Sequence, residues 1–512
     1  MSYQFISVTT YYALKNFLTQ RVLPGLVVLS LLAGCHPART ITFVHINDVY
    51  EITPLANGKE GGLARVAHIS KQLKKKNPKN TYFVLAGDFL SPSVIGTLRD
   101  QGERIRGKQM VEVLNAAGLD YVTFGNHEFD YDDTAPTVLN QRIEESKFRW
   151  VATNVQQRQG NKTVPFNKDG AAFPTSLILD NGKVRIGFFG VCLPVNKDFV
   201  QITDPFEASR REYADLKGRT DAVVALTHLD IVDDKRLAEQ IPGLSLIMGG
   251  HDHDHMLHQV GKVTIAKADA NAKTVYIHRL RFNRKHGLVR VESELKTIDE
   301  TVPEDSKTAA VVAKWQQKAA KSFDELGFEP TEVVYTTTEP WDAREGTVRR
   351  EHGPLTTTIA QSMRNAFPES DLAIFNGGSV RIDDILNGPV TQYDIVRILP
   401  FGGGISQATM TGELLAKVLE AGRLSRGKGG FLHYANASYD EATKTWLVAN
   451  QPIETTRAYK VVLPDFLPTG KEFGMSFLIP ANTGIIQPIF TPNPDDPRSD
   501  IRKVFIDYLR KM

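Results

Sequence analysis

The chain has 512 residues, of which 41% are hydrophobic and 23% are charged, a composition that is ordinary for a globular protein. Its 61 Lys and Arg residues and 59 Asp and Glu residues leave a net charge of +2, so no overall field favours a nucleic-acid polymer or an anionic membrane. This length exceeds that of one typical domain, and we therefore expect more than one.

The N-terminus has the features of an export signal. Lys15 and Arg21 precede an apolar segment, residues 22–33, that is too short to span a bilayer comfortably. Small residues then lead to Cys35, which is typical of a cleavage site. The LAGC ending resembles a bacterial lipobox, which would make Cys35 the lipidated first residue of an exported periplasmic or cell-surface lipoprotein. His36 after it favours the outer membrane if the cell is Gram-negative. The alternatives are an ordinary signal peptide or a membrane anchor that happens to carry a cysteine.

Cysteine usage limits how the protein is stabilised. Cys35 and Cys192 are the only cysteines in the sequence, so lipidation of Cys35 would exclude an internal disulfide. Cys192 lies in an apolar run and is interpreted as a small buried hydrophobic residue. The protein is then expected to rely on its core and on bound metals.

Five apolar runs between residues 41 and 255 end on polar side chains of similar chemistry. The runs read as buried strands, and α/β enzymes place their chemistry at the carboxyl ends of such strands. Segments 61–76 and 107–117 read as helices, and this alternation predicts an α/β domain. The polar residues that end the runs are Asn47 and Asp48; Asp88; Asn126, His127, Glu128 and Asp130; His228; and His251, Asp252, His253, Asp254 and His255.

The donor atoms of this set favour a catalytic metal centre. A neutral amide, an imidazole and two carboxylates crowd onto the turn at residues 126–130, and such a group is costly to bury without partners. Oxygen and nitrogen donors with no thiolate suit Mn, Fe, Co, Zn or Mg rather than a structural cysteine-rich zinc site.

The rest of the chain divides into a closing segment, a helix and a second domain. Residues 262–298 read as successive strands with polar turns, which predicts an antiparallel close to the first domain. The stretch 302–327 begins with Pro and acidic residues and ends at Gly, as helices do. We therefore predict a first domain at 36–300 after the signal at 1–35, a connecting helix at 301–327, and a second domain at 328–512.

The motifs GD, GNHE, H and GHxH occur here in the order found in calcineurin-like metallophosphoesterases, and the chain resembles that group. The GNHEFD form and the second half of the chain resemble the 5'-nucleotidase family. This resemblance implies an N-terminal four-layer α/β/β/α sandwich that holds two metal ions (Mn, Zn, Co or Fe), followed by a C-terminal α+β domain that binds the nucleoside.

The resemblance also implies an activity, a metal-dependent phosphoric ester hydrolase that releases phosphate from 5'-nucleotides. Two alternatives keep the site and change the substrate: a 2',3'-cyclic-nucleotide phosphodiesterase or a UDP-sugar hydrolase. An alternative of another class is a non-catalytic surface lipoprotein that binds nucleosides. A membrane would be contacted through the lipid anchor only.

Matching the family motifs residue by residue implies how the metals are held. Asp88 would bridge both ions, Asp48 and His253 would bind the first, and the second would be bound by Asn126, His228 and His251. Tyr50 stands where the family has His. A phenol is acidic only near pH 10, but a neighbouring cation favours the phenolate, so Tyr50 is expected to ligate and to prefer trivalent iron. Water in that position, or competition from Glu51, is the alternative.

The resemblance assigns His127 no metal. It would donate to the transition-state phosphoryl group or the leaving group, with Asp130 orienting it and favouring its cationic form. The alternative is a purely structural His127–Asp130 pair.

The second half matches the family's substrate motifs. The resemblance implies phosphate contacts by two arginines, which suit bidentate recognition, and stacking of the base between two phenylalanines. Each of these residues also has a structural alternative. The two phenylalanines could be ordinary core residues, Arg350 could be a solvated surface side chain, and Gly430 could simply form a tight turn. The positions are Arg350 and Arg381 for phosphate, Asn376 for base or ribose, Phe401 and Phe466 for stacking, Gly430 beside the base, and Glu472 in place of the family's ribose-binding Asp.

Overall fold

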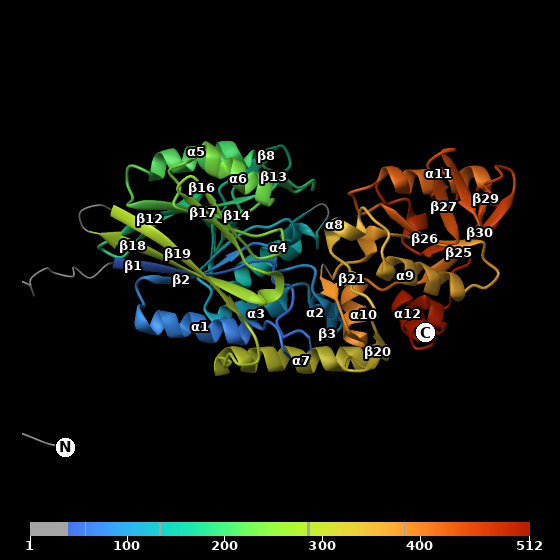
Figure 1. The fold of residues 1–512 in the computed structure, drawn as a ribbon, viewed down its shortest axis with the longest axis horizontal. Coiled ribbons are helices and arrows are strands. Elements are labelled where there is room, and N and C mark those ends of the chain that lie inside the picture. The colour runs from blue at the N-terminus through green and yellow to red at the C-terminus, as the bar shows by residue number, and fades with distance from the viewer. Residues whose placement is uncertain (1–38, 57, 133–134, 284–286, 383) are drawn as a thin grey trace, which may run out of the picture.

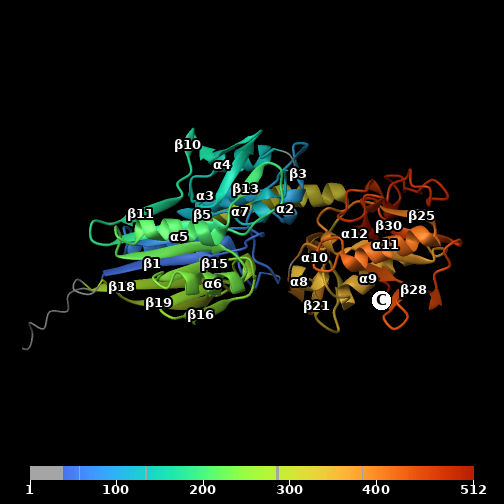
Figure 2. The ribbon, with the colours of Figure 1, turned by 90° about the horizontal axis from the view of Figure 1, so that it is seen from above.

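A computed structural model of the chain describes residues 39–512 except 57, 133–134, 284–286 and 383 (Figure 1). Cys35 and the apolar segment before it lie outside the described residues. Within the described part of the chain, no helix combines the length and the apolar character that crossing a membrane requires. Two domains lie side by side, and the long helix α7 (Ser306–Leu326) runs along the first towards the second (Figures 1 and 2).

Two six-stranded sheets form the centre of the first domain. The first sheet has the order β19-β18-β1-β2-β5-β6 and the second has the order β11-β12-β14-β15-β17-β16. The strands of the first are β1 (Arg39–Ile46), β2 (Thr81–Ala86), β5 (Tyr121–Thr123), β6 (Arg149–Trp150), β18 (Thr274–Asn283) and β19 (Gly287–Thr297). Those of the second are β11 (Ser176–Asp180), β12 (Arg185–Cys192), β14 (Ala222–His228), β15 (Leu246–Gly249), β16 (Met256–Val260) and β17 (Val263–Lys267).

Helices cover the outer faces of both sheets, which gives the predicted four-layer α/β/β/α arrangement (Figure 1). Between the sheets, apolar side chains such as Phe43 and Phe188 stack at 6.3 Å and exclude water from both inner faces. On the first sheet lie α1 (Leu63–Lys76), α2 (Val94–Thr97), α3 (Lys108–Ala117) and α4 (Thr137–Glu145); on the second lie α5 (Pro205–Leu216) and α6 (Ile231–Gln240). Smaller strands are β3 (Arg99–Asp100), β4 (Glu103–Arg104), β7 (Val155–Gln159), β8 (Lys162–Val164), β9 (Asn167–Lys168), β10 (Ala171–Ala172) and β13 (Val200–Ile202).

The segment at 262–298 differs from the expectation of a single antiparallel close. Strand β17 pairs parallel to β15 in the second sheet, whereas β18 pairs antiparallel to β1 in the first. A short 3-10 turn, Ala270–Ala272, carries the chain from one sheet to the other. The alternating pattern correctly indicates strands here, but a polar turn that joins two sheets looks the same in sequence as a hairpin turn.

A capping side chain marks the start of helix α7, and a glycine marks its end. The Asp305 side chain accepts a hydrogen bond from Thr308 N at 2.9 Å, and Gly327 adopts φ 74° after the last turn. Its buried face packs on α1 and α3, and Trp315 donates to Glu112 at 3.0 Å. The connecting helix is therefore part of the first domain's surface.

The second domain is built on a four-stranded sheet of order β25-β30-β22-β26. Its strands are β22 (Leu372–Asn376), β25 (Ile405–Thr411), β26 (Leu432–Ala435) and β30 (Ala458–Pro464), and its helices are α8 (Glu345–Val348), α9 (Pro354–Asn365), α10 (Gln392–Ile398), α11 (Gly412–Leu424) and α12 (Ile501–Leu509). Short ribbons complete it: β20 (Val333–Thr336), β21 (Trp341–Asp342), β23 (Ile385–Leu386), β24 (Pro389–Thr391), β27 (Ala437–Asp440), β28 (Thr445–Val448) and β29 (Gln451–Pro452).

Candidate metal centre and substrate cleft

The five predicted runs are all strands, and their carboxyl ends meet. Strands β1, β2 and β5 belong to the first sheet, whereas β14 and β15 belong to the second. Four of the predicted ligands then adopt a left-handed backbone, an uncommon conformation for residues other than glycine that gathers at functional sites. Their φ angles are 52° for Asp48, 55° for Asp88, 83° for His251 and 64° for His253.

The side chains of this edge form one buried cluster. Asp88 Oδ2 lies 3.0 Å from His228 Nε2, which is 3.1 Å from Asn126 Oδ1. The ligand atoms of Asp88, His228 and His251 all lie within 4.8 Å of one another, a spacing that suits one shared ion. Gly125 permits this approach, since an added Cβ would lie 2.1 Å from Asp88 Oδ1.

The donor set fits metal ions on two independent observations. Asp48 Oδ1 is buried, and no donor among the described residues makes a hydrogen bond to it; its neighbour His253 Nε2 is 3.4 Å away. A buried carboxylate oxygen in that position is costly unless a cation compensates it. In addition, the ring of His228 donates from Nδ1 to Ala86 O at 2.7 Å, which leaves Nε2 facing Asp88 as a ligand atom.

The charges within the cluster support each other. Burial disfavours the ionised form of Asp48, but His253 and His228 hold its pKa below the usual value. Burial likewise opposes the charging of His228, yet the Asp88 carboxylate raises its pKa to about 9. A site that keeps its carboxylates ionised is ready to receive cations.

Tyr50 reaches the cluster from the loop after β1. Its hydroxyl lies 3.0 Å from His253 Nε2 and 3.4 Å from Asp88 Oδ2, and the ring is buried. Glu51 points away and accepts a 2.6 Å hydrogen bond from Tyr393, so the alternative in which Glu51 takes the ligand position is wrong for this arrangement. Tyr50 therefore occupies the place that the sequence motif gives to a ligand.

His127 and Asp130 form the expected pair. His127 Nδ1 lies 2.7 Å from Asp130 Oδ2, and the same oxygen accepts from Ser91 Oγ at 3.1 Å and from Arg381 at 3.0 Å. Burial alone would lower the pKa of His127, but the Asp130 and Asp88 carboxylates outweigh it and raise that pKa to about 9. The imidazole is thus held as a cation with Nε2 unengaged by Asp130.

Glu128 has a role that the motif alone does not reveal. Its carboxylate accepts backbone hydrogen bonds from Gly125 at 2.6 Å, Asp88 at 2.9 Å, Phe89 at 2.8 Å and Leu90 at 3.2 Å, and so joins the two loops that carry Asp88 and Asn126. Burial and the nearby Asp88 raise the pKa of Glu128 to about 7. The sequence placed a carboxylate on this turn without indicating which way it points.

The predicted substrate residues gather on loops at one end of the second domain. Asn376 donates to Glu472 at 2.7 Å, and an added Cβ on Gly430 would lie 3.2 Å from the same carboxylate. Phe401 and Phe466 are 58% and 43% exposed, which excludes the core-packing alternative for both. Their loops are joined by a hydrogen bond from Gly404 N to the Asp465 side chain at 2.9 Å.

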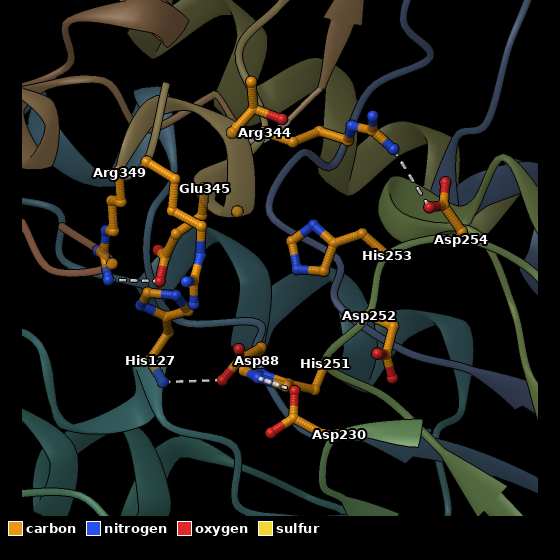
Figure 3. A pocket seen from close by; sticks show the side chains of 14 residues that line it. Asp88, His127, Asp230, His251, Asp252, His253, Asp254, Arg344, Glu345 and Arg349 are labelled. Carbon is orange, nitrogen blue, oxygen red and sulfur yellow. Dashed lines mark hydrogen bonds and ion pairs between the residues drawn. The ribbon is translucent and has the colours of Figure 1, made fainter. Parts of the chain in front are cut away.

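A cavity of about 330 Å³ joins the metal centre to the second domain (Figure 3). Asp88, His127, His251 and His253 line one side, and the loop that carries Arg350 lines the other. Six further charged side chains line the cavity: Asp230, Asp252, Asp254, Arg344, Glu345 and Arg349. Asp252 and Asp254 belong to the polar residues that end the fifth run in the sequence, whereas nothing in the spacing of the other four distinguishes them from surface residues. Ion pairs join Arg344 to Asp254 at 3.4 Å and Arg349 to Glu345 at 2.5 Å.

The two halves match two known domain families. Residues 41–255 match the calcineurin-like phosphoesterase family, and residues 333–477 match the 5'-nucleotidase C-terminal domain. The 5'-nucleotidase of Mus musculus is 25% identical over 87% of this chain and 86% of its own length. A trifunctional nucleotide phosphoesterase of Bacillus subtilis is 24% identical over 83% of this chain, which corresponds to 30% of that longer protein.

Solved structures share the fold across both domains. A 5'-nucleotidase precursor from Thermus thermophilus superposes with a TM-score of 0.69 at 21% identity, over 92% of this chain and 96% of that one. A sulfate thiohydrolase of Thermus thermophilus superposes with a TM-score of 0.64 at 14% identity, over 92% and 94% of the two chains. One architecture therefore accompanies different activities, and the substrate is determined by the residues of the site rather than by the fold.

Proposed function

We propose that this protein releases phosphate from nucleoside 5'-monophosphates. It joins a calcineurin-like phosphoesterase domain to a 5'-nucleotidase C-terminal domain, as in the 5'-nucleotidase family of metal-dependent phosphoester hydrolases. The cavity between the domains carries this proposal. It has carboxylates and imidazoles on one side and arginine on the other. The exposed rings of Phe401 and Phe466 are not part of its lining and lie on two loops of the second domain that are hydrogen-bonded to each other.

In this proposal the second domain binds the substrate at both ends. Arg350 and Arg381 take the phosphate, and Phe401 and Phe466 stack on the base, which contributes roughly 1–3 kcal/mol for each ring. Arg381 already lies over the Phe401 ring, 5.6 Å from its centroid, so the phosphate and base contacts adjoin. Asn376 and Glu472 form a hydrogen-bonded pair that faces the ribose.

The first domain performs the chemistry. Asp88 would serve both metal ions. Asp48, Tyr50 and His253 would hold the first, and Asn126, His228 and His251 would hold the second, with Mn, Zn, Co or Fe as the candidate ions. Ions bound there supply Lewis acidity towards the phosphoryl oxygens and towards the attacking water.

His127 supplies the remaining charge stabilisation. As an imidazolium fixed through Nδ1 by Asp130, it donates from Nε2 to a phosphoryl oxygen or to the departing ribose oxygen. The pairing with Asp130 keeps the proton on the ring at neutral pH, since its pKa lies near 9.

A substrate panel tests this function. With Mn²⁺ present, we expect phosphate release from AMP to exceed release from glycerol phosphate, 2',3'-cyclic AMP and UDP-glucose. Glycerol phosphate has no base for the aromatic pair, and the other two compounds have no terminal 5'-phosphate monoester. The metal-stripped protein should bind adenosine and release no phosphate. A preference for the cyclic nucleotide or the UDP-sugar would replace the proposed substrate, and adenosine binding without turnover under every metal tested would make the protein a nucleoside-binding lipoprotein.

We further propose that the protein is exported and anchored by lipid on Cys35, in the periplasm or at the cell surface. Support comes from the LAGC motif that ends at Cys35 and from the basic and apolar residues before that motif. A nucleotidase placed there would act on nucleotides outside the cytoplasm.

A further inference from the structure

A buried lysine at the end of β17 has no part in the reaction described above. Lys267 has 0% of its surface exposed, although burying a lysine is costly unless its charge is paired and its protons are all bonded. Space for the side chain depends on Gly249, where an added Cβ would lie 2.8 Å from Lys267 Cε.

The ammonium group bonds to two loops at once. Nζ donates to Leu229 O at 2.5 Å and to Gly250 O at 2.8 Å. It also pairs with the Asp252 carboxylate, and Asp234 Oδ2 lies 2.9 Å away. Three protons thus face four acceptors, and two carboxylates lie against one positive charge, so the cluster carries a net charge of −1 when both are ionised.

The two carbonyls belong to the neighbours of two proposed ligands. Leu229 directly follows His228, and Gly250 directly precedes His251. The rings of these histidines meet edge-on with centroids 5.3 Å apart. A shift of either carbonyl would therefore move an imidazole that has to share one ion with its neighbour.

The same cluster reaches the strand end that carries His228. Asp234, on helix α6, accepts a 2.7 Å hydrogen bond from the hydroxyl of Thr227, the residue before His228. Lys267 and Asp234 together therefore fix the backbone on both sides of that ligand.

The first metal position is held by other contacts. Asn47 donates to Asp48 Oδ2 at 2.7 Å, Asn271 N donates to Asp48 O at 2.8 Å, and Ala270 N donates to His253 O at 2.9 Å. Lys267 takes part in none of these bonds, so they do not depend on it. The two positions adjoin through Asp48 Oδ2, which accepts from His251 N at 2.9 Å, and through Asp252, the partner of Lys267 that lies between His251 and His253.

From this arrangement we propose that Lys267 is a positioning residue for the second metal position, where it holds His228 and His251 at the separation that one ion requires. The inference rests on the metal centre proposed above and extends it to a residue that contacts neither ion nor substrate. An ammonium suits this task because it donates to two carbonyls and to Asp252 and pairs electrostatically with Asp234, whereas an apolar side chain would leave all four acceptors uncompensated.

Replacement of Lys267 by methionine tests the proposal by metal binding rather than by turnover. Apo protein is titrated with Mn²⁺, and bound ions are counted by calorimetry and by elemental analysis of the dialysed protein. We expect the wild type to bind two ions, and Lys267→Met to keep one while its affinity for the other falls about 10- to 100-fold, as for other groups that orient ligands.

Lys71 provides a matched control. Its Nζ also pairs with a carboxylate, Asp305 at 2.6 Å, and donates to a carbonyl, Ala116 O at 2.8 Å, but it lies on α1 away from the centre. Lys71→Met should bind both ions as the wild type does. Lys267→Met with Asp234→Asn is the second variant, because it restores the net charge of the buried cluster while the amide oxygen that replaces the carboxylate can still accept from Thr227.

The outcomes separate the two proposals. Selective weakening of one ion in either Lys267 variant, with an apo melting temperature near that of Lys71→Met, supports the positioning role. Wild-type affinity for both ions overturns it, as does equal weakening of both ions or failure of both variants to fold, since Lys267 would then serve the whole domain. A wild type that binds no ion overturns the metal centre itself, before any variant is compared.

Discussion

Asp130→Asn should shift the pH dependence of kcat, so that activity is lost at a lower pH than in the wild type, because Asp130 keeps His127 protonated. Burial and the carboxylates together place the pKa of His127 near 9 instead of 6.5, a difference of roughly 3 kcal/mol in favour of the cation. Burial is the largest single influence and opposes the charge, so it outweighs Asp88 once Asp130 is neutral. The pKa of His127 then falls towards the ordinary imidazole value of 6.5.

The loss of activity follows from the protonated fraction. At pH 7.5 a pKa of 6.5 leaves about one-tenth of His127 protonated, so kcat should fall about tenfold from this cause alone. The deficit should shrink to less than about twofold near pH 6 and grow above pH 8. Cations bound at the centre would lower the pKa of His127 further, so both profiles are recorded with the same metal ion at saturation.

The assay is a kcat profile for AMP between pH 5.5 and 9.5 with metal content measured at each end. Asp132→Asn is the control: Asp132 accepts from Val138 N at 3.1 Å and makes no described contact with His127, so its profile should parallel the wild type. A profile for Asp130→Asn parallel to the wild type, with both metals bound, would refute the role of the pair.

Four further predictions concern single positions. Asp88→Ala should abolish phosphate release and lower the metal content, measured by elemental analysis; full activity with two ions retained would contradict the shared carboxylate. If Tyr50 binds trivalent iron as a phenolate, the iron-loaded protein should absorb visible light and Tyr50→Phe should remove the band, whereas a colourless iron-loaded wild type contradicts that ligation. Phe401→Ala should raise KM for AMP about 5- to 100-fold, by the loss of one stacking ring, with kcat and the hydrolysis of glycerol phosphate little changed; an unchanged KM would exclude stacking. Cys35→Ser should move the protein out of the membrane fraction, and continued membrane association after signal removal would contradict the lipid anchor.

Local sequence patterns predicted much of the first domain. The five apolar runs became strands, and the residues after each run became one cluster, because parallel strands bring their carboxyl ends to a common edge. Cys192 is buried as expected. The partner of β17 was not predictable, since alternation reports which residues face a core and not which sheet the strand joins.

The motifs could not predict contacts between side chains that are far apart in the sequence, and such contacts determine how the residues of the site act together. Arg381 was assigned to phosphate and Asp130 to His127, each from its own motif, yet the two side chains meet at 3.0 Å across 251 positions of sequence. One carboxylate oxygen therefore serves the catalytic imidazole and the phosphate-binding arginine together. A substrate phosphate that draws Arg381 towards itself also withdraws a positive charge from Asp130, which strengthens the hold of that carboxylate on the His127 cation. Substrate binding in the second domain would thereby be coupled to the charge state of the first, through a single ion pair that no motif contains.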